Sequence, residues 1–151
     1  MSFQNILVPV DGSKISLAAV QHAAEIAKAC NGELTLISLV AEDPYKDLDF
    51  AYYYVSAPMK EYFVQVYANA EKALQQASDI AASVGVDAQT RVIKSLSIGQ
   101  SIVSLATELE ADCIVMGSHG RTGMQKMLLG SVAAHVLGST QLPVLVVKAE
   151  A

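Results

Sequence analysis

The sequence predicts a single α/β domain, a doubly wound fold in which helices cover both faces of a five-stranded parallel sheet. Short apolar segments alternate with longer segments of helical periodicity, in the order β-α-β-α-β-α-β-α-β. The apolar segments are nonpolar almost throughout, as is typical of parallel strands that are covered on both faces. A length of 151 residues suits one domain, so we expect residues 1–151 to form one unit.

Five short apolar segments are the expected strands. Each is bounded by turn-forming residues or by the start of a helical pattern. They are Ile6–Val10, Leu34–Val40, Val86–Ile93, Cys113–Met116 and Pro143–Lys148.

Four segments with apolar residues at steps of three and four are the expected helices. The first follows Asp11-Gly12-Ser13, the second begins near Pro58, and the last runs from about Ser131 to Gly138. Their apolar stripes consist of Ala19, Ala23, Ile26 and Cys30 in the first helix, of Tyr62, Val66, Ala70, Ala73, Ala77, Ile80 and Val84 in the second, and of Ile98, Ile102, Leu105 and Leu109 in the third.

Helix start and stop signals support these assignments. Asn31-Gly32 closes the first helix, Pro58 suits the first turn of the second, and Gly85 ends it. Ser97 and Gln100 have the spacing of a capping box at the start of the third helix.

Charge and composition exclude several classes of protein. The chain has 15 acidic and 10 basic residues, a formal net charge of −5 and a pI near 5.0, which argues against nonspecific nucleic-acid binding. No apolar run approaches the roughly 18 residues of a membrane span, and the first residues do not resemble a signal peptide, so we expect a cytoplasmic protein without a membrane partner. Cys30 and Cys113 lack metal-ligand spacing and are expected to be reduced core residues.

A glycine-rich segment follows the fourth expected strand and continues to the start of the last helix. Gly117 and Gly120 come directly after the strand, and Gly130-Ser131 opens the helix. Glycine lets a backbone approach a ligand closely, and a helix N-terminus offers unpaired N–H groups to an anion. The segment therefore predicts a phosphate site, although it could also simply turn the chain between strand and helix.

Other common nucleotide and phosphate sites do not match. Gly12-Ser13-Lys14 is not a Walker A loop, and Asp11-Gly12-Ser13 is not the glycine fingerprint of a dinucleotide-binding fold. The turn after the first strand is too short for a flavodoxin loop, and the acidic residues of a receiver domain are absent.

The chain resembles the universal stress protein family, in its nucleotide-binding branch. Asn5–Ser13 is similar to the family's opening strand and loop, Cys113–Ser131 to its G-2x-G-9x-G-[S/T] signature, and Leu142–Val147 to its last strand. The resemblance implies an adenine nucleotide alpha hydrolase-like sheet in the order 3-2-1-4-5. It also implies a homodimer formed through the edge strand Pro143–Lys148 and an unidentified client protein.

The resemblance further implies that ATP, with Mg²⁺ or Mn²⁺, binds between the loops after the first and fourth strands. Asp11 would accept from the ribose or from a metal-bound water rather than ligate the metal directly, and it could instead cap the first helix. The implied binding residues are Pro9, Val10, Asp11, Leu39, Met116, Gly117, Gly120, Arg121, Gly130, Ser131, Val132 and Ala133.

Three functions remain open from the residues. The first is an ATP-binding regulatory protein of the stress response, the second a slow ATPase or self-phosphorylating protein using the same site, and the third a nucleotide-free dimeric interaction module. We expect no catalytic residue and no fast turnover, because no general base is placed for an attacking water. His119 lies in the glycine segment without an evident carboxylate partner, and Tyr52-Tyr53-Tyr54 is a lid, a partner surface or a loosely packed loop.

Overall fold

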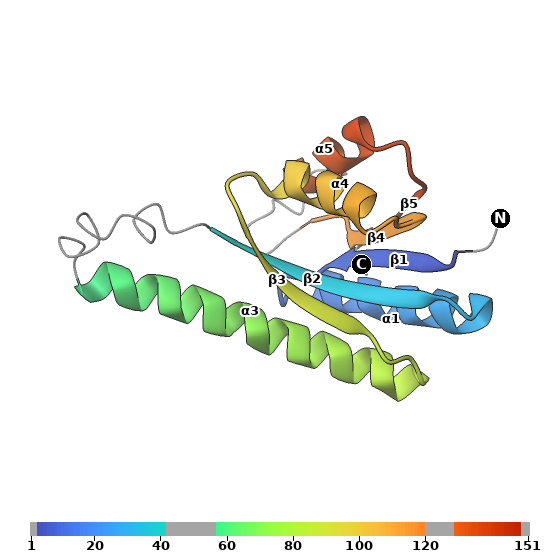
Figure 1. The fold of residues 1–151 in the computed structure, drawn as a ribbon, viewed down its shortest axis with the longest axis horizontal. Coiled ribbons are helices and arrows are strands. Elements are labelled where there is room, and N and C mark those ends of the chain that lie inside the picture. Colours follow the sequence, from blue (N-terminus) through green and yellow to red (C-terminus); the bar gives the residue numbers. More distant parts are fainter. Residues whose placement is uncertain (1–2, 42–56, 120–128, 149–151) are drawn as a thin grey trace.

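A computed structural model of the chain describes residues 3–41, 57–119 and 129–148 (Figure 1). The Tyr52-Tyr53-Tyr54 run lies outside these residues. The described residues form, in order, β1 (Asn5–Pro9), α1 (Lys14–Cys30), β2 (Glu33–Ala41), α3 (Ala57–Val84), β3 (Gln89–Ser95), α4 (Ile98–Glu108), β4 (Cys113–Gly117), α5 (Ser131–Ser139) and β5 (Val144–Val147).

The strands form one five-stranded parallel sheet in the order β3-β2-β1-β4-β5, which confirms the predicted fold and strand order. The central strand β1 pairs with β2 on one side and with β4 on the other, so that Ile6 lies opposite both Leu34 and Cys113. The chain therefore winds outward from β1 in both directions, and β3 and β5 are the two edges of the sheet.

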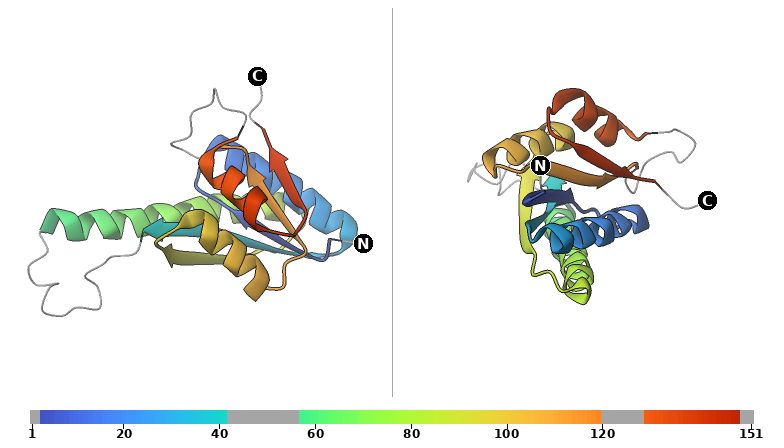
Figure 2. Two further views of the ribbon diagram at one scale, coloured as in Figure 1. Left: turned by 90° about the horizontal axis from the view of Figure 1, so that it is seen from above. Right: turned by 90° about the vertical axis from the view of Figure 1, so that its right-hand side faces the viewer.

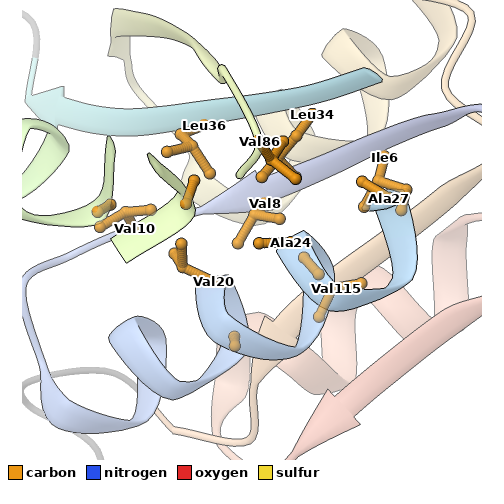
Figure 3. Packing of buried hydrophobic residues seen from close by; sticks show 14 of the residues in the cluster. Ile6, Val8, Val10, Val20, Ala24, Ala27, Leu34, Leu36, Val86 and Val115 are labelled. Atoms are coloured by element: carbon orange, nitrogen blue, oxygen red, sulfur yellow. The ribbon is translucent and has the colours of Figure 1, made fainter. Parts of the chain in front are cut away.

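Two layers of helices cover the sheet (Figures 1 and 2). Alternate residues of β1 point to opposite faces: Ile6 and Val8 pack with α1 and α3, and Leu7 packs with α4 and α5. Figure 3 shows the first of these cores, in which Ala24 and Ala27 of α1 lie close to the strands. Burial on both faces explains why the strands are nonpolar almost throughout.

The ends of α1 follow the signals in the sequence. Ser13 is the N-cap, and its hydroxyl accepts a 3.2 Å hydrogen bond from the backbone N–H of Ser16. Asn31 ends the helix in the left-handed conformation, with φ 54°. Pro58 lies in the first turn of α3, as predicted.

The predicted capping box at α4 is wrong. Ser97 makes no side-chain cap, and the Gln100 amide instead donates to the Ser104 hydroxyl at 3.3 Å. The turn is held by Ser95, whose Oγ accepts from the Ser97 N–H at 3.0 Å and lies 2.6 Å from the Ser101 hydroxyl. The Ser97 N–H, which the Gln100 side chain would accept from in a capping box, is thus bound by the Ser95 hydroxyl instead.

The third strand begins and ends later than predicted, at Gln89–Ser95 rather than residues 86–93. Its register is set by β2, along which Thr35 lies opposite Gln89 and Ala41 opposite Ser95. Val86 is buried in the α1/α3 core although it precedes the strand. Val86 is therefore apolar because it is buried in the core, although it lies outside the strand and does not pair in the sheet.

The N-terminal part of α3 extends past the end of the sheet (Figure 1). Tyr62 is 59% exposed and Val64 is 70% exposed, whereas Ala73 and Ala77 further along are buried. The apolar stripe predicted for this helix is therefore exposed at Tyr62, because the sheet does not reach this part of the helix. Within the described residues, no helix combines the length and the apolar character needed to cross a membrane.

Candidate functional site

A cavity of about 340 Å³ lies at the carboxyl ends of β1 and β4. The two strands are neighbours, and the chain departs from them toward opposite edges of the sheet. Ligands of open α/β sheets bind at such a point, and pockets for small molecules typically measure about 300–1,000 Å³. The cavity therefore has the position and the size of a ligand site.

The cavity brings together ten of the twelve residues that the resemblance implies. Gly120 and Arg121 lie outside the described residues. Those that line the cavity are Pro9, Val10, Asp11, Leu39, Met116, Gly117, Gly130, Ser131, Val132 and Ala133.

Five further lining residues were not predicted as site residues: Ser16, Ile98, Ile102, Ser118 and His119. Ile98 and Ile102 begin the apolar stripe of α4, and the sequence does not show which end of that helix faces the loops. Ser118 and His119 lie within the glycine segment, but the spacing of its glycines does not show whether the side chains between them are buried or exposed.

The loop after β1 forms one lip of the cavity. Asp11 is exposed there, and its Oδ1 accepts a 2.9 Å hydrogen bond from the backbone N–H of Ser13. Gly12 has φ 82°, a conformation that favours glycine. Because Ser13 is the N-cap of α1, the alternative that Asp11 caps this helix is wrong.

The end of β4 and the start of α5 form the other lip. The backbone N–H of Gly130 donates to the carbonyl of Ser118 at 2.7 Å, which fixes the start of α5 against the end of β4. Gly130 is the N-cap and supplies no side-chain cap to the first turn. The N-terminal end of α5, from Ser131 to Ala133, lines the cavity, so the positive end of the helix dipole faces it.

A side chain at either glycine of this lip would crowd its neighbours. A Cβ on Gly117 would collide with the Ile15 Cγ2 of α1. A Cβ on Gly130 would lie 3.1 Å from the Ser118 carbonyl oxygen and 3.3 Å from the His119 Cα. The two glycines therefore let the end of β4 and the start of α5 pack closely against their neighbours.

Apolar side chains from three further elements also line the cavity. Leu39 comes from β2, Ile98 and Ile102 from α4, and Met116 from β4. The cavity therefore offers both an apolar surface for a flat nonpolar group and a helix N-terminus for an anion.

His119 is the most unusual polar residue of the cavity wall. Its side chain is 8% exposed, and its Nδ1 lies 3.0 Å from the Ser118 hydroxyl, itself buried. Its Nε2 is buried and has no hydrogen-bond partner among the described residues. Buried polar atoms are rarely left in this state.

The described residues contain no group of three His, Cys, Asp or Glu side chains that could hold a metal ion. Asp11 is the only carboxylate among the described lining residues, so these residues would supply few of the ligands of a metal ion bound here. Mg²⁺ is commonly bound in that way, with one or two carboxylates.

A family model identifies the chain. The model of the universal stress protein family matches residues 2–148, nearly the whole length. The chain belongs to the universal stress protein family.

Curated relatives agree with this assignment. Universal stress protein MJ0531 of Methanocaldococcus jannaschii is 35% identical over 148 residues, which cover 97% of this chain and 82% of the relative. Universal stress protein YxiE of Bacillus subtilis is 31% identical, over 97% of this chain and 99% of the relative.

Solved structures share the fold over almost the full length. Universal stress protein UspA from Lactobacillus plantarum superposes with a TM-score of 0.81 at 25% identity, covering 97% of this chain and 99% of that one. A universal stress protein in complex with cAMP has a TM-score of 0.70 at 30% identity and covers 98% of both chains.

Proposed function

We propose that this universal stress protein binds ATP in the cavity between β1 and β4 and acts as a nucleotide-dependent regulatory protein. The observation that carries the proposal is that apolar side chains and the N-terminus of α5 line the same cavity, together with Gly117 and Gly130. A nucleotide has the matching halves, a flat base and an anionic phosphate chain. A relative of 30% identity in complex with cAMP supports an adenine nucleotide as the ligand class.

The lining residues suggest how the ligand is divided along the cavity. The base fits the apolar end beside Leu39, and the ribose fits between Asp11 on one lip and Gly117 on the other. The phosphates fit at Gly130–Ala133, where backbone N–H groups and the Ser131 hydroxyl are available as donors. Gly120 and Arg121, which the resemblance places at the phosphates, complete the proposed set.

Mg²⁺ or Mn²⁺ would accompany the nucleotide. Asp11 is the only carboxylate among the described residues that line the cavity, and it faces the phosphate end from the opposite lip. An anionic side chain near phosphate is favourable only when a cation lies between them. Asp11 would therefore hold a metal-bound water or the ribose hydroxyls.

Binding and not turnover is the proposed role. Fast phosphoryl transfer needs an oriented nucleophile and strong neutralisation of the developing charge. Among the described lining residues, Asp11 and His119 are the only ionisable side chains. Multiple-turnover release of phosphate from ATP at a rate well above background would favour the slow-ATPase alternative.

We also propose a homodimer formed through β5. This strand is an edge of the sheet, it pairs only with β4 among the described strands, and Leu145 on it is 41% exposed. An apolar edge strand offers unpaired backbone groups that a second copy would satisfy.

The direct test of the ligand is to denature the purified protein and to identify any released nucleotide by mass spectrometry. Calorimetry with ATP and Mg²⁺ then measures the affinity of the emptied protein. Release of ATP, or saturable binding of it, is expected. A protein that carries no nucleotide and also gives no binding heat would refute the proposal and leave the nucleotide-free interaction module.

A further inference from the structure

Ser118 and His119 form a buried polar pair on the cavity wall, next to the N-terminus of α5. We propose that His119 is a ligand-binding residue of this site, whose Nε2–H donates a hydrogen bond to an anionic oxygen held at the start of α5. The proposal deepens the proposed nucleotide function and rests on it for the identity of the anion, a phosphate of the nucleotide.

The first support is the unpartnered nitrogen. His119 is more than nine-tenths buried, and its Nε2 has no hydrogen-bond partner within the described part of the chain. A buried donor or acceptor without a partner is costly to a folded protein. Such a group is explained when a ligand supplies the missing partner.

The second support is the position of the ring. An added Cβ on Gly130 would lie 3.5 Å from the His119 Cδ2, so this edge of the imidazole lies against the N-cap of α5. Nε2 is bonded directly to Cδ2. The unpartnered nitrogen therefore lies beside the N-terminal end of the helix, where an anion is favoured.

The third support is that the hydrogen bond to Ser118 determines which imidazole nitrogen of His119 carries the proton. The Ser118 side chain is 1% exposed, and its only hydrogen-bond partner among the described residues is the His119 Nδ1 at 3.0 Å. The hydroxyl hydrogen is satisfied only if it is donated to Nδ1, which places the proton of a neutral imidazole on Nε2. In a protonated ring Nε2 is also a donor, so in both states it offers N–H to the ligand.

Because Nε2 is the donor, the ligand atom that it binds must be a hydrogen-bond acceptor. An Nε2 that carries a proton cannot ligate a metal ion, but it suits a phosphate oxygen. His119 also differs from the backbone N–H groups of α5, which cannot be removed by substitution. It thus offers a side chain through which the phosphate end can be tested by itself.

The experiment compares two unbranched substitutions of similar length. His119→Gln keeps an N–H donor near the position of Nε2, and His119→Met removes it. We expect the Kd for ATP to rise at least about tenfold in His119→Met and to stay within about threefold of wild type in His119→Gln, whereas the Kd for adenosine is unchanged in both. Equal ATP affinity of His119→Met and wild type would overturn the inference.

A merely structural role would give a different result. Because Nε2 has no partner among the described residues, we expect the melting temperature of unliganded His119→Met to be no lower than that of wild type. A parallel fall in stability and in affinity for both ATP and adenosine, in both variants, would show that the residue only supports the fold.

The ¹⁵N resonances of the imidazole ring test the role of His119 independently of whether the protein binds ATP. The signal of His119 is assigned by its absence in His119→Gln, and tripolyphosphate is a probe without a base. A shift of Nε2 on addition of tripolyphosphate, in a protein that binds no ATP, would uphold the role of His119 and refute the nucleotide. No shift with either ligand would refute the role of His119.

Discussion

The backbone N–H of Gly130 donates a 2.7 Å hydrogen bond to the carbonyl oxygen of Ser118. The same Ser118 donates its own N–H to the carbonyl of Val147, at 2.8 Å, at the end of β5. One residue after β4 therefore holds both the start of α5 and the end of the edge strand. The geometry of the anion-binding end depends on main-chain bonds, which makes it sensitive to any added side chain.

Gly130→Val is expected to abolish nucleotide binding and to leave the fold intact. A Cβ there would lie 3.1 Å from the Ser118 carbonyl, and the further methyl groups of valine would occupy space at the start of α5. The φ of −74° is ordinary for any residue, so the backbone itself is not strained. Calorimetry with ATP and Mg²⁺ measures the loss, and circular dichroism verifies the fold.

Gly138→Val is the matched control in the same helix. Nothing lies within 4 Å of a Cβ at Gly138, so the free energy of unfolding should change by less than about 1 kcal/mol. Its affinity for ATP should equal that of wild type. If Gly130→Val also bound normally, the phosphate end would have been assigned to the wrong residues.

Gly117→Ala should destabilise the protein through α1. The added methyl group collides with the Ile15 Cγ2, and overpacking of this kind typically costs about 1–3 kcal/mol. Chemical denaturation measures the change in the free energy of unfolding.

The Ile15→Ala substitution in the Gly117→Ala background tests the cause. Ile15→Ala removes the colliding methyl group, so the double variant should be more stable than the sum of the single effects predicts. Additive effects, measured in a double-mutant cycle, would show that the two positions do not interact.

Much of the fold follows from local patterns in the sequence. Alternate residues such as Leu7 and Val8 face separate cores, and strands that are apolar on both sides predict helices on both faces. The position of the cavity was predictable too, because Asp11 and Gly117 each follow a strand and the carboxyl ends of adjacent parallel strands share one edge of the sheet.

Other features depend on partners that are distant in the sequence. The bounds of β3 come from its register with β2, and the exposure of Tyr62 comes from where the sheet ends. The failed capping box shows the same limit at short range, since the Ser95 hydroxyl accepts from the Ser97 N–H that the Gln100 side chain would bind in a capping box. The lone Nε2 of His119 has no signature in sequence, because it is defined by what surrounds it in space.

The two cysteines should differ in reactivity. Cys113 is 2% exposed in the α1/α3 core, as predicted, whereas Cys30 is only half-buried. Burial raises the pKa of the Cys113 thiol, the neighbouring Asp112 carboxylate raises it further, and a backbone hydrogen bond at Leu145 partly offsets both. A thiol reagent at neutral pH should therefore label Cys30 in the native protein and Cys113 only after unfolding, as peptide mass spectrometry would show.

Stability should fall in alkaline solution for the same reason. The pKa of the Cys113 thiol is raised in the folded state, so its neutral form contributes fully to the free energy of unfolding at pH values below the pKa of the thiol in the unfolded chain. As the pH rises above that value, the unfolded chain ionises first, so the free energy of unfolding decreases. Cys113→Ala should reduce this alkaline slope, and Cys30→Ala is its control. Equal slopes in the two variants would contradict the assignment.

Leu145→Lys should convert the proposed homodimer into a monomer. Leu145 is 41% exposed on β5, the edge strand, and a lysine there disfavours pairing of two edges while its stem still covers the strand. Light scattering coupled to gel filtration measures the mass, which should be near 32 kDa for wild type, twice the 16.0 kDa of the chain, and near 16.0 kDa for the variant.

Leu137→Lys, at an equally exposed leucine on α5, is the control and should remain dimeric. A wild-type protein that elutes as a monomer at micromolar concentration would refute the dimer, and a dimeric Leu145→Lys would move the interface away from β5.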